Sequence, residues 1–213
     1  MWEAMGRQLR NPEGLGGRLT GKFMRVVNRT PNRLAVDALD LAPEDVALDL
    51  GCGPGHALAL MAARAATVHG MDQSETMLGQ AAQANRLAVR EGRVVLARGE
   101  FDRLPYPTGM FDKILASNVM YFWKNAPGVL AEIRRVMRLG GRLSIYVTDA
   151  RTMRQWKFAG PDTHRLFDAD ALRILLRRGG FENDRITLSP VRLSGGIHGL
   201  LATAETRPLQ SNP

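Results

Sequence analysis

The chain has 213 residues and a formal net charge of +8, and it contains a single cysteine. That length suits one α/β domain with one sizeable core, and the lone cysteine excludes a disulfide within the chain. The most apolar helical stretch, residues 57–66, is too short to cross a bilayer and contains Arg64, so no transmembrane span is expected. No signal-peptide pattern is present, and the expected location is the cytoplasm.

The first 33 residues carry more than half of the excess positive charge, with seven basic and two acidic side chains. Within them, residues 15–29 have an amphipathic helical pattern in which an apolar stripe lies beside a basic arc. One interpretation is a helical lid that packs over a ligand site. The other is peripheral contact with an anionic membrane, at its inner face, and the two are compatible.

A short apolar run, residues 47–50, leads into a glycine cluster and predicts a buried strand that enters a tight loop. Asp49 closes the strand, and the glycines remove side chains that would keep a ligand away from the backbone. A second apolar run, residues 67–71, ends in Asp72, where an acid can accept hydrogen bonds from both hydroxyls of a ribose. The loop consists of Gly51, Cys52, Gly53, Pro54 and Gly55, with the cysteine interpreted as a packing residue rather than a nucleophile.

The spacing of these glycines separates two classes of ligand. A dinucleotide site requires Gly-x-Gly-x-x-Gly, because the third glycine lets the helix pack close while the pyrophosphate sits on its N-terminus. Here the spacing is Gly-x-Gly-x-Gly, and His56 occupies the place of that third glycine. The loop therefore predicts a ligand with a ribose and no pyrophosphate, and a dehydrogenase is the outside alternative.

With these motifs the chain resembles the class I S-adenosylmethionine-dependent methyltransferases, whose first motif is an acidic strand end followed by such a loop. Later segments resemble the family in the same order. Residues 99–101, Gly-Glu-Phe, stand where the family usually has Gly-Asp-Ala or a relative. Residues 104–120 resemble its turn, fourth strand and donor-facing loop, and residues 130–147 resemble its last core helix, a glycine turn and the fifth strand. The resemblance covers roughly residues 43–150 and is closest to small bacterial methyltransferases of quinones, lipids and secondary metabolites.

This resemblance implies an α/β, Rossmann-like, doubly wound sheet of seven strands, mostly parallel with an antiparallel last strand, and an N-terminal helical lid. The alternation of strands and helices from residue 46 to residue 147 also predicts a parallel sheet with helices on both faces. Residues 1–213 would then form one methyltransferase domain. Its expected parts are a lid and substrate segment (1–42), a cofactor-binding core (43–150), and an acceptor loop with the last strands (151–213). Asp168 is expected to cap a helix that ends at Arg178.

The same resemblance implies where the cofactor, S-adenosylmethionine, is bound. Asp72 would bind the ribose, Glu100 would accept a hydrogen bond from the adenine amino group, and Phe101 would pack near the ring. The strand-end residues should converge, because the carboxyl ends of parallel strands share one edge of the sheet. No metal is expected, since the chain has no cysteine cluster and no His-x-x-x-His spacing. The expected cofactor-binding residues are Asp49, Gly51, Cys52, Gly53, Gly55, Asp72, Gln73, Met77, Glu100, Phe101, Ser117 and Asn118.

The implied reaction is transfer of the methyl group to a small or lipid-like acceptor by in-line displacement, with release of S-adenosylhomocysteine. The enzyme mainly has to align donor and acceptor and to exclude water, and a general base is needed only if the acceptor must lose a proton. His164 and Tyr121 are the candidate bases. Tyr121, Phe122 and Trp123 either wall the acceptor pocket or pack against the following helix.

Two other functions stay open: a membrane-associated phospholipid N-methyltransferase, and a non-catalytic S-adenosylmethionine-binding module. The complete glycine loop with its two acids argues against a site that has lost its catalytic function. Nucleic acid is not an expected partner, because the chain has no appended RNA-binding module and only three tryptophans and three tyrosines. The sequence leaves N-, O- and C-methylation and the oligomeric state open.

Overall fold

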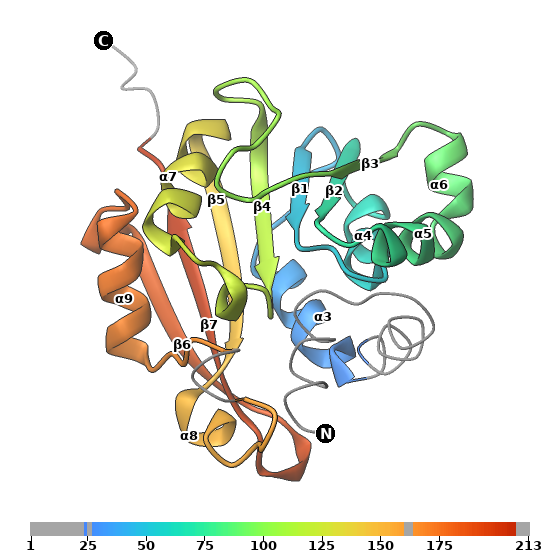
Figure 1. Ribbon diagram of the computed structural model, residues 1–213. Coiled ribbons are helices and arrows are strands. Elements are labelled where there is room, and N and C mark those ends of the chain that lie inside the picture. Colours follow the sequence, from blue (N-terminus) through green and yellow to red (C-terminus); the bar gives the residue numbers. More distant parts are fainter. Residues whose placement is uncertain (1–23, 25–26, 160–163, 208–213) are drawn as a thin grey trace, which may run out of the picture.

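In the computed structural model, which describes residues 24, 27–159 and 164–207, a seven-stranded sheet forms the centre of the molecule (Figure 1). The strand order is β3-β2-β1-β4-β5-β7-β6. Strands β1 to β5 pair in parallel, whereas β7 is antiparallel to both β5 and β6. This order confirms the expected sheet with an antiparallel last strand. The strands are β1 (Val46–Leu50), β2 (Thr67–Asp72), β3 (Val94–Arg98), β4 (Phe111–Ser117), β5 (Met137–Thr148), β6 (Ile186–Arg192) and β7 (His198–Glu205).

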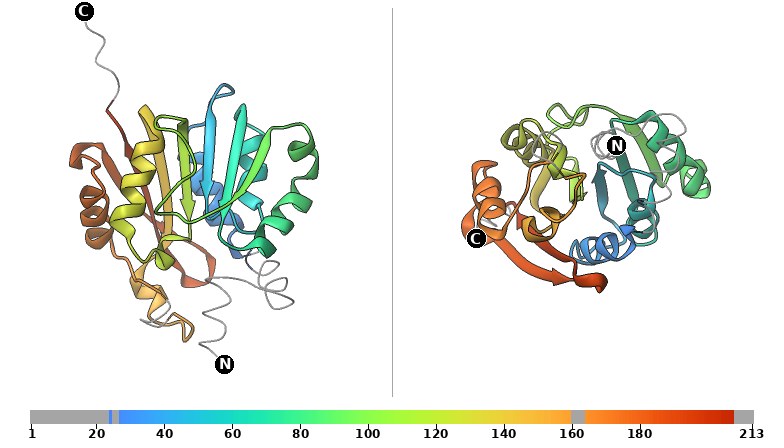
Figure 2. Two further views of the ribbon diagram at one scale, coloured as in Figure 1. Left: turned by 45° about the horizontal axis from the view of Figure 1, so that its top comes forward. Right: turned by 60° about the horizontal axis from the view of Figure 1, so that its bottom comes forward.

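Helices cover both faces of the sheet, which confirms the doubly wound arrangement (Figures 1 and 2). Side chains alternate along β1, so that Leu48 and Leu50 face the core under α7 and α9 while Ala47 faces the core under α3 and α4. The described helices are α3 (Arg29–Asp37), α4 (His56–Ala62), α5 (Glu75–Ala84), α6 (Arg86–Arg90), α7 (Ala126–Val136), α8 (Ala150–Met153) and α9 (Ala169–Arg178). Short 3-10 turns lie at η1 (Met120–Phe122), η2 (Asn183–Arg185) and η3 (Ser194–Gly196).

At two helix boundaries a polar side chain makes hydrogen bonds to the backbone. The expected cap of α9 is confirmed, because the Asp168 side chain accepts a hydrogen bond from the backbone N–H of Ala171. The helical region after β2 is interrupted at Asn85, which separates α5 from α6. The side-chain amide of Asn85 donates to the carbonyl of Gly55, so the break ties α5 to the glycine loop.

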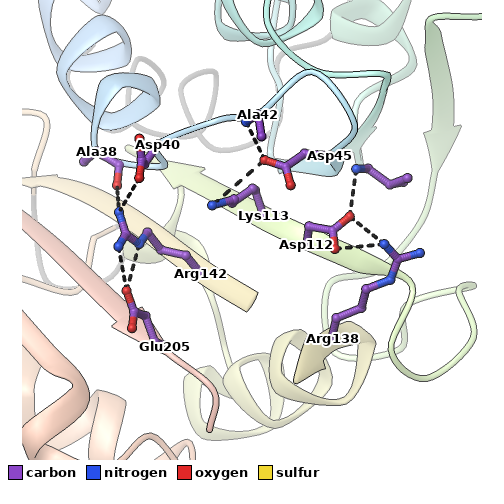
Figure 3. Close-up of polar contacts among 10 residues, drawn as sticks. Ala38, Asp40, Ala42, Asp45, Asp112, Lys113, Arg138, Arg142 and Glu205 are labelled. Atoms are coloured by element: carbon purple, nitrogen blue, oxygen red, sulfur yellow. Dashed lines mark hydrogen bonds and ion pairs between the residues drawn. The ribbon is translucent and has the colours of Figure 1, made fainter. Parts of the chain in front are cut away.

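Charged side chains at the amino-terminal edge of the strands fasten the sheet (Figure 3). Both carboxylate oxygens of Asp112 accept from Arg138, and one of them also accepts from the backbone N–H of Val46 at 2.9 Å. Nearby, Arg142 on β5 donates to Glu205 on β7. Because the carboxyl ends of the parallel strands lie at the other edge, near α3 and α8 (Figure 1), this network is separate from the cavities described next.

Candidate active site

The glycine loop after β1 has a left-handed backbone at three positions. Gly51, Gly53 and Gly55 have φ values of 79°, 51° and 81°, a region that favours glycine. A Cβ atom at Gly51 would lie 2.4 Å from Cγ2 of Val119, and one at Gly55 would lie 2.6 Å from Nδ2 of Asn85. A Cβ atom at Gly53 would meet nothing within 4 Å. Internal packing therefore requires Gly51 and Gly55, whereas Gly53 has open space beside its Cα atom.

Asp72, the last residue of β2, holds this loop in place. Its Oδ2 accepts a hydrogen bond from the backbone N–H of Gly53 at 2.9 Å, and its Oδ1 accepts one from Ser74 at the same distance. Burial raises the pKa of Asp72, and the backbone N–H donors partly offset that rise. The two carboxylate oxygens are thus fixed at a strand tip, the position from which an acid can bind a pair of neighbouring hydroxyls.

Asp49 is a buried acid beside the same loop, with only 2% of its surface exposed. Its Oδ2 makes no hydrogen bond to any residue that the structure describes. Burial, followed by the charge of Asp72, raises the pKa of Asp49 to about 8. An ionised carboxylate buried without a partner is costly, so a cation that bound beside this oxygen would stabilise its ionised form.

Cys52 is buried between these acids. Burial, followed by the charges of Asp49 and Asp72, raises the pKa of its thiol well above the ordinary value. Because the thiolate is the nucleophilic form, the environment keeps this cysteine inert. Its position fits the packing role expected from the sequence.

A crevice along the loop brings together all the residues expected to bind the cofactor except Gly55 and Glu100. Met77 and Phe101 are buried in its wall, and Gln73 lies beside them. Glu100 is exposed, and its carboxylate accepts a hydrogen bond from Nε2 of Gln73 at 2.7 Å. The structure therefore places Glu100 outside the crevice lining, bonded to Gln73, which does line the crevice.

Helix α3 closes the crevice with two asparagines, one turn apart, that sequence reasoning missed. Oγ of Ser117 donates to Oδ1 of Asn32 at 2.8 Å, and Nδ2 of Asn118 donates to Oδ1 of Asn28 at 3.1 Å. Both asparagines line the crevice. Their i,i+4 spacing is the signal that could have identified a polar helix face turned towards the site.

A larger cavity, of about 380 Å³, adjoins the crevice. Four residues line both: Met24, Asn28, Asn118 and Phe122. The described residues that line the cavity include no aspartate, glutamate, lysine or arginine. Its aromatic walls are formed by Tyr121, Phe122, Tyr146, Trp156, Phe158 and His164.

The two candidate bases both line this cavity, in different surroundings. The Tyr121 hydroxyl donates to Oδ1 of Asn118 at 2.8 Å and accepts a hydrogen bond from the backbone N–H of Thr148, and burial raises its pKa. His164 is buried among rings, with its centroid 4.9 Å from that of Phe122 and 5.9 Å from that of Phe158. Tyr121 is thus fully engaged in hydrogen bonds, and His164 belongs to the aromatic wall.

The cavity also has an unexpected wall in the hairpin between β6 and β7. Leu193 and Ile197 line it, and the backbone N–H of Leu193 donates to the carbonyl of Ile197 at 2.8 Å. The glycine pair at 195–196, between two short strands, was the available turn signal. Trp123, by contrast, is buried in the core and does not line the cavity.

Most of the amphipathic N-terminal pattern lies outside the described residues. Of residues 15–29, only Met24 and residues 27–29 are described. Val27 lines the cavity with 44% of its surface exposed, and Arg29 begins α3. Within the described ranges, no helix has the length and apolar character that crossing a bilayer requires.

Comparison with known proteins agrees with this geometry. A family model described as "Methyltransferase domain" matches residues 48–145. An uncharacterised methyltransferase of Bacillus subtilis (strain 168), YdaC, is 30% identical over 129 residues, which cover 60% of this chain and 69% of the relative. A malonyl-[acyl-carrier protein] O-methyltransferase of Legionella pneumophila is 32% identical over 136 residues, which cover 59% of this chain and 45% of that protein.

Among solved structures, the [4+2]-cyclase SpnF superposes with a TM-score of 0.72 at 20% sequence identity, covering 84% of this chain and 82% of that chain. At this identity the likeness concerns the fold alone, and the reaction of a relative does not transfer with it. The matched stretch spans less than half of the Legionella relative. The family model and the Bacillus relative, together with the glycine loop and the strand order, show that the chain belongs to the class I S-adenosylmethionine-dependent methyltransferases.

Proposed function

We propose that the protein transfers the methyl group of S-adenosylmethionine to a small, uncharged and largely apolar acceptor that binds in the aromatic cavity. The observation that carries this proposal is the shared wall between the two spaces. The cavity adjoins the crevice through Asn28, Asn118 and Phe122, and no formally charged side chain is among the described residues that line it. An acceptor in the cavity would therefore present one atom to the crevice and bury the rest of its surface against rings.

The crevice residues fit the cofactor chemically. Asp72 offers two fixed oxygens to the ribose hydroxyls, and the open side of Gly53 lets a ligand approach the backbone. Asp49 offers a buried oxygen, unpaired among the described residues, to a cationic group of the cofactor. When bound, S-adenosylmethionine supplies an electrophilic methyl group on a sulfonium.

The crevice has a cavity volume of only about 60 Å³, so we expect its walls to separate when a nucleoside-sized ligand enters. The side formed by α3 is held by two hydrogen bonds, from Ser117 to Asn32 and from Asn118 to Asn28. Each such bond contributes about 1 kcal/mol net, so breaking both costs little free energy and thermal motion can open this side of the crevice. We infer that α3 moves when the cofactor enters and closes over it, which gives the N-terminal segment the role of a lid.

The surroundings of the candidate bases favour an acceptor that needs little help to lose a proton. The Tyr121 hydroxyl is already engaged on both sides, and its raised pKa makes its deprotonated form scarce. His164 faces the cavity from the aromatic wall, so we propose it as the base if the acceptor is a hydroxyl. Aligning the acceptor and excluding water then supply most of the rate enhancement.

The phospholipid alternative receives less support from the cavity. A phosphate head group needs positive partners, and no lysine or arginine is among the described lining residues. The acceptor named for the Legionella relative is a malonyl group on a carrier protein. Its carboxylate would likewise find no positive partner among the described residues that line the cavity.

The test is to incubate the protein with methyl-labelled S-adenosylmethionine and a bacterial lysate, and then to partition the label between organic, aqueous and macromolecular fractions. We expect the label in the organic fraction. The variant Ile197→Trp narrows the cavity without touching the crevice, and it should lose most of this label while binding S-adenosylhomocysteine normally by calorimetry.

The matched control is Leu139→Trp, which adds the same ring at a position that is 60% exposed and outside both spaces. Its labelling should equal that of the wild type. Label confined to the aqueous or macromolecular fractions, or an Ile197→Trp variant with full activity, would refute the apolar acceptor.

A further inference from the structure

Asn118 occupies the junction between the crevice and the cavity. It follows directly after β4 and is one of the few residues that line both spaces. A methyl group that passed from a donor in the crevice to an acceptor in the cavity would cross the boundary that Asn118 forms with Met24, Asn28 and Phe122. Its neighbour Ser117 lines the crevice only.

The side-chain amide of Asn118 connects separate parts of the junction. Its Oδ1 accepts from the Tyr121 hydroxyl at 2.8 Å, and its Nδ2 donates to Oδ1 of Asn28 at 3.1 Å. The same Tyr121 hydroxyl accepts from the backbone N–H of Thr148 at the end of β5. One amide therefore links the aromatic wall, the end of β5 and the helix that covers the crevice.

The backbone of Asn118 is strained to hold this position. Its φ is +54°, and among the described non-glycine residues only Asp40 shares a positive φ, with the same value. Such a conformation costs on the order of 1–3 kcal/mol and persists where the surroundings fix it. Here the backbone N–H of Asn118 donates to the carbonyl of Tyr146 at 2.8 Å, in addition to the two side-chain bonds.

We propose that Asn118 is a positioning residue for methyl transfer, which rests on the proposed function. Its amide sets the Tyr121 ring and the start of α3 in the arrangement that aligns the acceptor atom with the donor. It acts through Tyr121 and Asn28, and its loss should lower the rate of transfer far more than the affinity for the cofactor.

The two residues with φ of +54° provide a matched pair of variants. In Asn118→Gly and Asp40→Gly the glycine accepts the backbone conformation without strain, so neither variant is expected to unfold. Asp40 has its side chain 84% exposed and lines neither space. Only Asn118→Gly removes the hydrogen bonds at the junction.

The experiment measures the initial rate of label transfer into the organic extract of the lysate, and the Kd for S-adenosylhomocysteine by calorimetry. For Asn118→Gly we expect the rate to fall by at least thirtyfold and the Kd to change by less than fivefold. Asp40→Gly should match the wild type in both. An Asn118→Gly rate within threefold of the wild type would overturn the proposal.

A double-variant cycle tests the link through the hydroxyl. Tyr121→Phe keeps the ring and removes the hydrogen bond to Asn118, so the double variant with Asn118→Gly should be no slower than Asn118→Gly alone. If the rate losses of the two single variants multiply in the double variant, the two residues act separately. That result would contradict the proposal that Asn118 acts through Tyr121.

Hydrogen exchange separates failure of this proposal from failure of the proposed function. With S-adenosylhomocysteine bound, the backbone amides of α3 and of residues 120–122 should exchange faster in Asn118→Gly than in Asp40→Gly. This readout needs no acceptor, so it decides the positioning role even if no fraction of the lysate takes up label. Equal exchange in the two variants would refute it.

Discussion

The carboxylate of Asp72 accepts a hydrogen bond from the backbone N–H of Gly53 at 2.9 Å, which ties the tip of β2 to the glycine loop after β1. The acid proposed to bind the ribose thus also shapes the loop beside it. Its second oxygen is held by the N–H of Ser74, so both acceptor atoms are in place before a ligand arrives. Pre-organisation of this kind lowers the cost of ordering the site on binding.

Replacing Asp72 should therefore weaken cofactor binding. Asp72→Asn removes the charge and one acceptor oxygen, and we expect a loss of about 1–3 kcal/mol in the binding of S-adenosylhomocysteine by calorimetry. Glu100→Gln is the matched control, because Glu100 is exposed and bonded to Gln73 outside the crevice lining. Equal losses in the two variants would contradict the separate placement of these acids.

Two glycines of the loop should respond differently to alanine. In Gly51→Ala the new Cβ would lie 2.4 Å from Val119, so we expect a loss of about 2 kcal/mol or more in the free energy of unfolding. Gly53→Ala meets no protein atom within 4 Å, and its cost should be only about 1 kcal/mol, from the positive φ. Urea unfolding and calorimetry together check the expectation that Gly53→Ala folds but binds S-adenosylhomocysteine poorly.

The buried acid Asp49 should make stability depend on pH. Burial and the charge of Asp72 raise its pKa from 3.8 to about 8, so the folded protein holds a proton that the unfolded chain loses near its ordinary pKa. The free energy of unfolding consequently falls as the pH rises between these two values. In Asp49→Asn this dependence is absent. As the pH is raised from about 6 to about 8.5, the free energy of unfolding of the variant should therefore increase by about 2 kcal/mol relative to that of the wild type.

Urea unfolding at the two pH values measures that difference directly. Wild type and Asp49→Asn curves that shift in parallel with pH would show that Asp49 ionises normally in the folded protein.

Asp112 offers a test of the fold that spares the site. Its carboxylate joins Arg138 to the backbone N–H of Val46 at the amino-terminal edge of the sheet (Figure 3). Asp112→Ala should lower the free energy of unfolding by about 1–3 kcal/mol, because it leaves a backbone donor and a guanidinium without their acceptor. Binding of S-adenosylhomocysteine should stay within twofold of the wild type, and a large loss of binding would show coupling between the two edges of the sheet.

Local sequence signals identified the parts of the site that depend on strand ends and turns. The apolar run that ends in Asp49 and the run that ends in Asp72 are buried strands, and parallel pairing brings their tips to one edge. The loop between β1 and α4 has positive φ values at its three glycines, a conformation that glycine adopts without strain. These features depend on a few adjacent residues, which is why they could be predicted without the structure.

The other walls of the crevice and the cavity are formed by contacts between segments that lie far apart in the sequence. Asn28 and Asn32 reach the site only because α3 packs beside the end of β4, and Ile197 reaches it because the β6–β7 hairpin folds back over the cavity. Gly55 was expected at the ligand, but packing against α5 accounts for its conformation. Glu100 was expected at the adenine; it is bonded to Gln73 and does not line the crevice, and its contact with adenine stays a prediction. Neither outcome has a local sequence signal.

The most direct measurement is a crystal structure of the protein with S-adenosylhomocysteine. We expect the ribose hydroxyls on the carboxylate of Asp72 and the sulfur atom beside Asn118, directed towards the aromatic cavity. A sulfur atom that faces away from Asn118, or a ribose that does not contact Asp72, would contradict methyl transfer from this crevice to an acceptor in the cavity.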